Sequence, residues 1–169
     1  MKVRCGFVTN SSSSSFILGF KDDADISRFR DYCDWLGYEE FYKLIHSLIE
    51  NNGKTDKAES LDLLWRYYSS DTSWNLADQK VKEAGLLPGR EEVLYRIELE
   101  KTPEFKEEVK RIVLETTDYL KKRKEIEDCQ YIVTEEIWDT NGGLLEWAIR
   151  NGFIESEFSR YCILVWNVG

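Results

Sequence analysis

The chain has 169 residues, with 32 acidic and 23 basic side chains and a formal net charge of −9 at pH 7. A chain of this length can bury roughly 70% of its unfolded surface around one core, so we expect a single domain. Aromatic residues make up 14% of the sequence, which argues against global disorder. The negative charge repels a phosphate backbone, so we expect no direct binding of duplex nucleic acid.

The four cysteines predict a reducing compartment. Cys5, Cys33, Cys129 and Cys162 are widely separated and lie in apolar or strand-like runs. This spacing favours buried free thiols over a disulfide framework or a zinc site, and His46 is the only histidine. The sequence has no run of the ~18 to 20 apolar residues that cross a bilayer, and its amino end lacks the apolar core of a signal peptide. We therefore expect a cytoplasmic protein with no membrane contact, no metal and no cofactor.

The amino-terminal segment predicts a strand, a loop and a second strand. Residues 2 to 8 alternate between apolar and other side chains, and residues 16 to 20 form a second short apolar run. Five consecutive serines and a preceding Asn separate the two runs. We expect residues 1 to 20 to form a strand–loop–strand element with the serines at its tip.

Between residues 25 and 85 the apolar residues recur at helical spacing and predict four helices. Gly37 and Gly85 lie where the first and the fourth helix should end. The polar stretch "SSDTSW" at 69 to 74 is predicted to be a loop with residues that can cap a helix. The apolar stripes of the four helices run from Ile26 to Leu36, Phe41 to Leu48, Leu61 to Tyr68 and Ala77 to Ala84.

The segment "EEVLYRIELE" alternates and predicts a strand over residues 92 to 99. A long helix over residues 102 to 124 should follow, with Thr102 as N-cap and Pro103 in the first turn. Residues 131 to 138 predict a strand and 144 to 151 a short helix. Residues 161 to 168 are apolar on both sides, which predicts a closing strand buried in the middle of a sheet.

This order of elements predicts an α+β fold over residues 1–169. We expect a mixed, mostly antiparallel sheet covered by helices, mainly on one face.

The serine run has two interpretations: a solvated loop or a ligand-binding site. Ser and Asn hydrogen-bond locally to the backbone, which favours a plain turn. Consecutive hydroxyl and N–H groups can also hold an anion, a nucleotide or another small polar ligand. The run lacks the glycines and lysine of a phosphate-binding loop, and we assign no catalytic residue. The candidate ligand-binding residues are Asn10, Ser11, Ser12, Ser13, Ser14 and Ser15.

A second candidate site is a protein-binding surface. Trp74 follows the polar stretch at an expected helix start, and an exposed Trp beside acidic residues can anchor a protein partner. Trp35 and Tyr32 fit either a core or a surface position. The acidic residues of this candidate site are Asp71, Glu135, Glu136 and Asp139.

The stretch "GFVTNSSSSSFIL" resembles an N-terminal signature, G-F-V-[ST]-N-S-S-S-S-S-F, of otherwise dissimilar, uncharacterised bacterial and bacteriophage proteins. Phe7, Asn10, the serines at 11 to 15 and Phe16 match it. Thr9 stands where Ser is more usual, and Cys5 where the group often has Asn. The resemblance covers about a tenth of the chain. It implies a phage or mobile-element setting, and a segment that a common processing or modification enzyme reads.

These observations lead to three hypotheses of function. The first is a phage or mobile-element accessory protein that binds a host or phage protein, including as an inhibitor of a host defence or nucleic-acid enzyme. The second is a small-ligand or nucleotide-binding protein or enzyme with its site at the serine loop. The third is a structural or oligomeric phage protein, including a homodimer that pairs through an exposed strand at residues 92 to 99.

Overall fold

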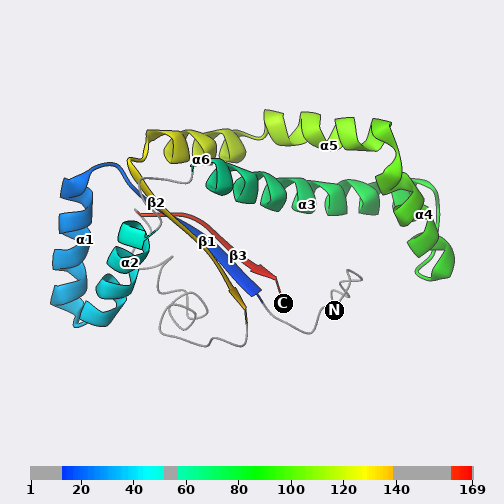
Figure 1. Cartoon of the computed structure of the whole chain (residues 1–169). Helices are drawn as coiled ribbons and strands as arrows, with labels where there is room; N and C mark the ends of the chain where they lie inside the picture. The colour runs from blue at the N-terminus through cyan, green and yellow to red at the C-terminus, as the bar shows by residue number, and fades with distance from the viewer. Residues whose placement is uncertain (1–12, 52–56, 139–160, 169) are drawn as a thin grey trace. The chain divides into compact units, whose positions relative to one another are not determined.

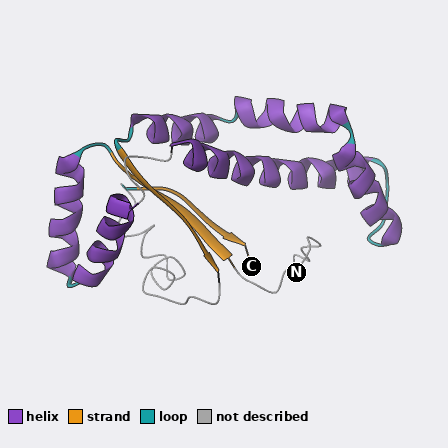
Figure 2. Ribbon diagram, viewed as in Figure 1, coloured by secondary structure: helices purple, strands orange, loops and turns teal. Residues whose placement is uncertain are grey.

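A computed structural model of the chain describes residues 13–51, 57–138 and 161–168 (Figures 1 and 2). These residues form six α-helices and three β-strands, so the described part is mostly helical. The chain divides into two compact units: unit 1 comprises residues 1–60 and 125–169, and unit 2 comprises residues 61–124. The elements in chain order are β1 (Ser13–Phe20), α1 (Asp23–Leu36), α2 (Glu39–Asn51), α3 (Lys57–Glu83), α4 (Arg90–Lys101), α5 (Pro103–Glu115), α6 (Thr117–Asp128), β2 (Tyr131–Trp138) and β3 (Cys162–Val168).

The sheet of unit 1 has the strand order β2-β1-β3, and both pairings are antiparallel. Ser13 of β1 lies opposite Trp138 of β2, and Phe20 lies opposite Tyr131. The prediction of helices with an antiparallel sheet is confirmed in this coarse form. A mixed sheet is wrong for the described strands, because neither of their pairings is parallel. The central strand is β1, whereas we predicted that the closing strand β3 would take the middle position.

Strand β1 is buried on both faces. Phe16, Leu18 and Phe20 point toward α1 and α2, where they form one apolar core with residues of both helices. Fully burying one such side chain contributes about 1.5–3 kcal/mol, so this cluster is the main apolar stabilisation of unit 1. Figure 1 shows α1 and α2 at one side of the sheet. The other buried members of the cluster are Phe29, Cys33, Phe41, Ile45, Val133 and Tyr161.

The opposite face of β1 leaves no room for a side chain at position 19. A Cβ atom on Gly19 would lie 2.5 Å from Cys129 Sγ and 2.7 Å from Ile163 Cδ1. Ser60, in the first turn of α3, and Thr134 of β2 share a hydrogen bond of 2.5 Å between their hydroxyl oxygens. Glycine at position 19 therefore permits the close packing of this face.

Capping residues determine both ends of α1 and the start of α5. The Asp22 carboxylate accepts a hydrogen bond from the Asp25 amide at 2.8 Å, which caps α1. Gly37 adopts φ 75° and its N–H donates to Asp34 O, as expected for a left-handed helix end. Thr102 Oγ1 accepts a hydrogen bond from the Phe105 amide, and Pro103 occupies the first helical position. The predicted helix end at Gly37 and the predicted helix start at Thr102 and Pro103 are confirmed, whereas the cap at Asp22 was not predicted.

Three predictions on the middle of the chain are wrong. Residues 69 to 74 do not form a loop, because α3 continues through them from Lys57 to Glu83. Residues 92 to 99 are not a strand but lie in α4. The long helix over residues 102 to 124 is interrupted at Thr116, whose backbone is extended and whose Oγ1 donates to Ile112 O at 2.9 Å.

Local hydrogen bonds explain why the polar stretch stays helical. Ser69 Oγ donates to Arg66 O within the helix, and Asn75 Nδ2 donates to the Asp71 carboxylate one turn earlier. These bonds occupy side chains that would otherwise compete with the helix. Buried Leu64 and Leu76 lie on either side of the stretch, so the apolar stripe continues across it.

The strand predicted over residues 2 to 8 and the helix predicted over 144 to 151 lie outside the described residues. The single-domain prediction stays a prediction.

We expect Gly19→Ala to lower the free energy of unfolding by about 1–3 kcal/mol, because the added methyl group overpacks the space beside Cys129 and Ile163. Urea denaturation followed by circular dichroism measures the change. The double variant Gly19→Ala/Cys129→Ala should regain part of the loss, since it removes the nearest atom. Unchanged stability of Gly19→Ala would contradict the packing described for this face.

Candidate functional site: an acidic, tryptophan-bearing surface on α1 and α2

The structure does not place the serines as predicted. Ser13, Ser14 and Ser15 lie in β1, opposite residues 138, 137 and 136 of β2, and Ser15 is buried. The prediction of a loop is therefore wrong for these three residues. Asn10, Ser11 and Ser12 lie outside the described residues, so their role as ligand-binding residues stays a prediction.

The predicted partner-binding residues that the structure describes lie in two different elements, β2 and α3. Glu135 and Glu136 lie in β2 of unit 1, opposite Phe16 and Ser15 of the central strand. Asp71 and Trp74 lie in α3 of unit 2. Asp139 lies outside the described residues.

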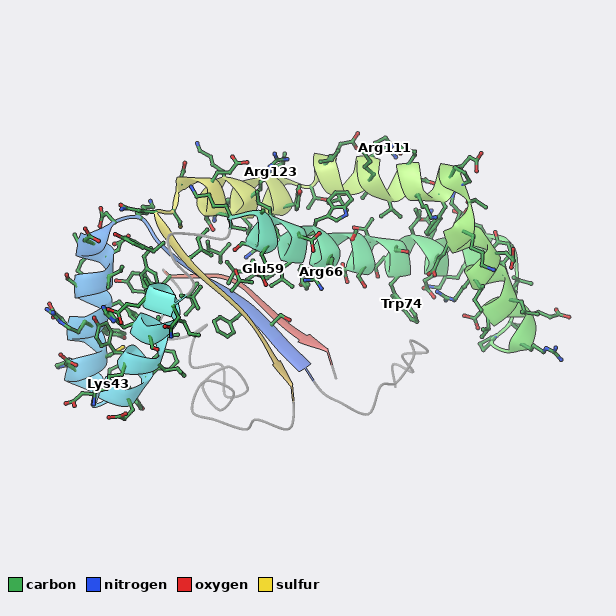
Figure 3. The ribbon with its side chains drawn as sticks, viewed as in Figure 1. Lys43, Glu59, Arg66, Trp74, Arg111 and Arg123 are labelled. Atoms are coloured by element: carbon green, nitrogen blue, oxygen red, sulfur yellow. The ribbon has the colours of Figure 1, made fainter. Side chains whose placement is uncertain are left out.

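Trp74 lies in the middle of α3 rather than at a helix start, and it is 38% exposed. Figure 3 shows its side chain extending from α3. The Arg96 guanidinium of α4 lies over the indole ring, 5.0 Å from its centroid. Arg96 also donates to Glu92 and to Asp78, each at 2.8 Å. Trp74 is thus engaged within unit 2, which makes it a weaker anchor for a partner than the sequence suggested.

We expect Arg96→Ala to lower the free energy of unfolding by about 1–3 kcal/mol, because it removes two charge-assisted hydrogen bonds, one of them to the partly buried Glu92 carboxylate. Asp78 keeps its ion pair with Lys82. Arg111→Ala is a matched control. Arg111 pairs with Glu115 along α5, both side chains are exposed, and such pairs contribute about 0.2–1 kcal/mol. Chemical denaturation measures both variants. Equal effects of the two substitutions would show that Arg96 does not tie α4 to α3.

The negative charge of the protein belongs entirely to unit 1. Residues 1–60 and 125–169 contain 19 acidic and 10 basic residues, whereas residues 61–124 contain 13 of each. Unit 2 is therefore neutral at pH 7, and unit 1 carries the whole net charge of −9. Unit 1 therefore supplies the net electrostatic attraction to a basic partner.

The most exposed aromatic side chain of unit 1 in the described residues is Trp35, which is 77% accessible to solvent in the last turn of α1. Its ring stacks against Tyr32, with centroids 6.0 Å apart and planes 24° from parallel. Tyr32 is partly buried against the core of unit 1. The stack holds Trp35 in place at the surface, so a partner would meet a pre-ordered aromatic side chain.

Acidic residues flank this tryptophan in the sequence, along α1 and at the start of α2. Asp31 lies one turn before Trp35 and pairs with Arg30 at 3.0 Å, and Glu40 pairs with Lys43, labelled in Figure 3, at 2.6 Å. Asp34 and Glu39 are exposed and form no ion pair with the part of the chain that the structure describes. Four carboxylates against the two cations Arg30 and Lys43 leave this surface with a net negative charge. We name Asp31, Asp34, Trp35, Glu39 and Glu40 the acidic tryptophan surface.

The sequence contained a signal for Trp35. Phe29 and Cys33 mark the buried side of α1, and position 35 lies about 200° from position 33 around a helix. That rotation places Trp35 on the solvent side. The pattern that favoured Trp74 depended on a loop that does not form.

Cys33 and Cys129 are buried free thiols. Burial raises the pKa of the Cys33 thiol to about 12 and that of the Cys129 thiol to about 11, so both stay protonated at neutral pH. Over residues 13–51, 57–138 and 161–168, no group of three His, Cys, Asp or Glu side chains has the geometry to hold a metal ion. Within the same ranges, every helix is too short or too polar to cross a membrane.

Comparison of the chain with protein-family models, with curated proteins and with solved structures finds no match. The resemblance of the amino-terminal segment to bacterial and bacteriophage proteins therefore stays a prediction.

A variant with Cys5→Ser and Cys162→Ser retains only the two buried thiols. Because their pKa values are raised, the thiolate fraction at pH 7 is roughly a hundredfold below that of an ordinary cysteine for Cys129 and roughly a thousandfold below it for Cys33. We expect a maleimide reagent to modify the folded variant at least that much more slowly than the same variant in denaturant. Similar rates in both conditions would contradict the burial of Cys33 and Cys129.

Proposed function

We propose that the protein acts by binding another protein, and that the acidic tryptophan surface of α1 and α2 is its contact site. The observation that carries the proposal is Trp35, which is 77% exposed on the unit that holds all the net negative charge. Tryptophan is enriched among the residues that dominate binding energy in protein interfaces. Large apolar side chains at this level of exposure cost free energy in water, which binding recovers.

The charge of the surface defines the chemistry of the partner. The net negative charge of the surface attracts cationic groups, and arginine pairs with carboxylates and also stacks on indole rings. The partner we propose presents a basic patch with arginine, such as a patch that holds the phosphates of a nucleic acid. Occupying that patch would exclude the nucleic acid, which makes inhibition of a host defence or nucleic-acid enzyme the proposed outcome. The resemblance of the amino-terminal segment implies a phage or mobile-element origin. Such an origin accords with this role.

Affinity isolation with three immobilised baits tests the proposal. Asp34→Lys reverses a charge in the last turn of α1, and Glu83→Lys makes the matched change in the last turn of α3 in unit 2. A lysine suits the carbonyl end of either helix, so we expect both variants to fold. We expect the wild type and Glu83→Lys to retain one common protein from a lysate of the organism that encodes the chain, and Asp34→Lys to lose it.

One further variant and competition by salt or heparin define the interface. Trp35→Ala should lower retention by about tenfold or more, as expected for an aromatic anchor. Salt and the polyanion heparin should release the bound protein, because both compete for its basic patch. If all baits retain the same proteins, or if heparin has no effect, the proposed surface is wrong.

A further inference from the structure

Helix α4 presents an apolar face to solvent in unit 2. Val93 is 43% exposed, Leu94 51% and Ile97 43%. Successive helical residues lie 100° apart, so these three side chains share one side of α4. The partly buried side chains of Glu92, Tyr95, Arg96 and Leu99 share the opposite side.

Helix α4 gains little from packing inside its own chain. It has 12 residues, and none of them is buried. An isolated helix of this length is marginal in water, and most helices in proteins depend on burial of an apolar face. Ion pairs of Arg96 with Glu92 and with Asp78 of α3 stabilise one side of the helix. The apolar side is therefore available for packing against a second surface.

We infer that a second copy of this chain covers this face, with the two α4 helices packed antiparallel about a two-fold axis near Leu94. An axis at that position brings Leu94 against its own counterpart and places position 90 of each copy opposite position 98 of the other. Arg90 is exposed and forms no ion pair among the residues described here. It would meet Glu98 of the other copy, whose carboxylate pairs with Lys101 at 2.9 Å and can accept a second cation. The two-fold axis makes this pair twice.

The charge distribution favours a second copy over a strongly charged partner. Unit 2 contains equal numbers of acidic and basic residues, so two copies can approach through it without net repulsion. Unit 1, at −9, repels its counterpart. The charged side chains that border the face, Arg90, Glu91, Glu98 and Lys101, also include both signs.

The contact area determines how strong the dimer is. One pair of helices buries less than the ~800 Å² per partner of a standard interface, so we expect weak, concentration-dependent association in the micromolar range. This inference concerns unit 2 and does not rest on the function proposed for α1 and α2. The predicted homodimer that pairs through a strand at residues 92 to 99 is wrong in its contact, since these residues are helical.

Sedimentation velocity of the full chain over about 1 to 300 μM tests the inference, because this range spans the affinity expected from a small interface. The wild type should shift from monomer to dimer. Leu94→Glu should weaken association by about tenfold or more, since two carboxylates then meet at the axis. Leu120→Glu, at a similarly exposed apolar residue of α6, is the matched control and should dimerise as the wild type does.

A charge swap identifies the pairing. Arg90→Glu and Glu98→Arg should each weaken the dimer, and the double variant should restore it, because the ion pair then forms in reverse. Circular dichroism confirms that each variant keeps the helical content of the wild type. A monomeric wild type over the whole range, a Leu94→Glu variant that dimerises normally, or a swap without recovery would each overturn the inference.

Discussion

Strand β1 is the element on which unit 1 depends, because it is central in the sheet and buried on both faces. One face carries Phe16, Leu18 and Phe20, which hold α1 and α2 in place. The other requires glycine at position 19, so that Cys129 and Ile163 can pack closely. The position of the acidic tryptophan surface follows from this core. Phe29 and Cys33 anchor the inner side of α1, and Trp35 is left on its outer side.

The two units differ in charge and in the kind of surface that they expose. Unit 1 combines the whole net charge of −9 with an exposed indole, which suits recognition of a basic partner. Unit 2 is neutral and exposes aliphatic side chains on α4, which suits contact with a second copy. A dimer formed through unit 2 would present two acidic surfaces at once, and two linked contacts can raise the apparent affinity for a repeated partner.

The sequence predicted the elements whose ends are set by local chemistry. The cap at Gly37, the Thr102–Pro103 helix start and the strand over residues 131 to 138 are all confirmed. The sequence-based prediction failed at α4, where the alternation of apolar residues suits a strand. The ion pair between Glu92 and Arg96 favours the helix instead, because the two side chains meet only when they lie one helical turn apart. The prediction also failed at Trp74, because its contact with Arg96 joins residues distant in the sequence. Such contacts depend on the tertiary structure, and local patterns do not contain them.

Photo-crosslinking in cells of the encoding organism tests the central claim most directly, since it captures the partner whatever its identity. A photoreactive phenylalanine derivative replaces Trp35 in one variant and Trp74 in another, which compares the two tryptophans under the same conditions. The account predicts a crosslinked protein of discrete mass from position 35 and none from position 74. Crosslinking from position 74 alone, or from neither position, would contradict it.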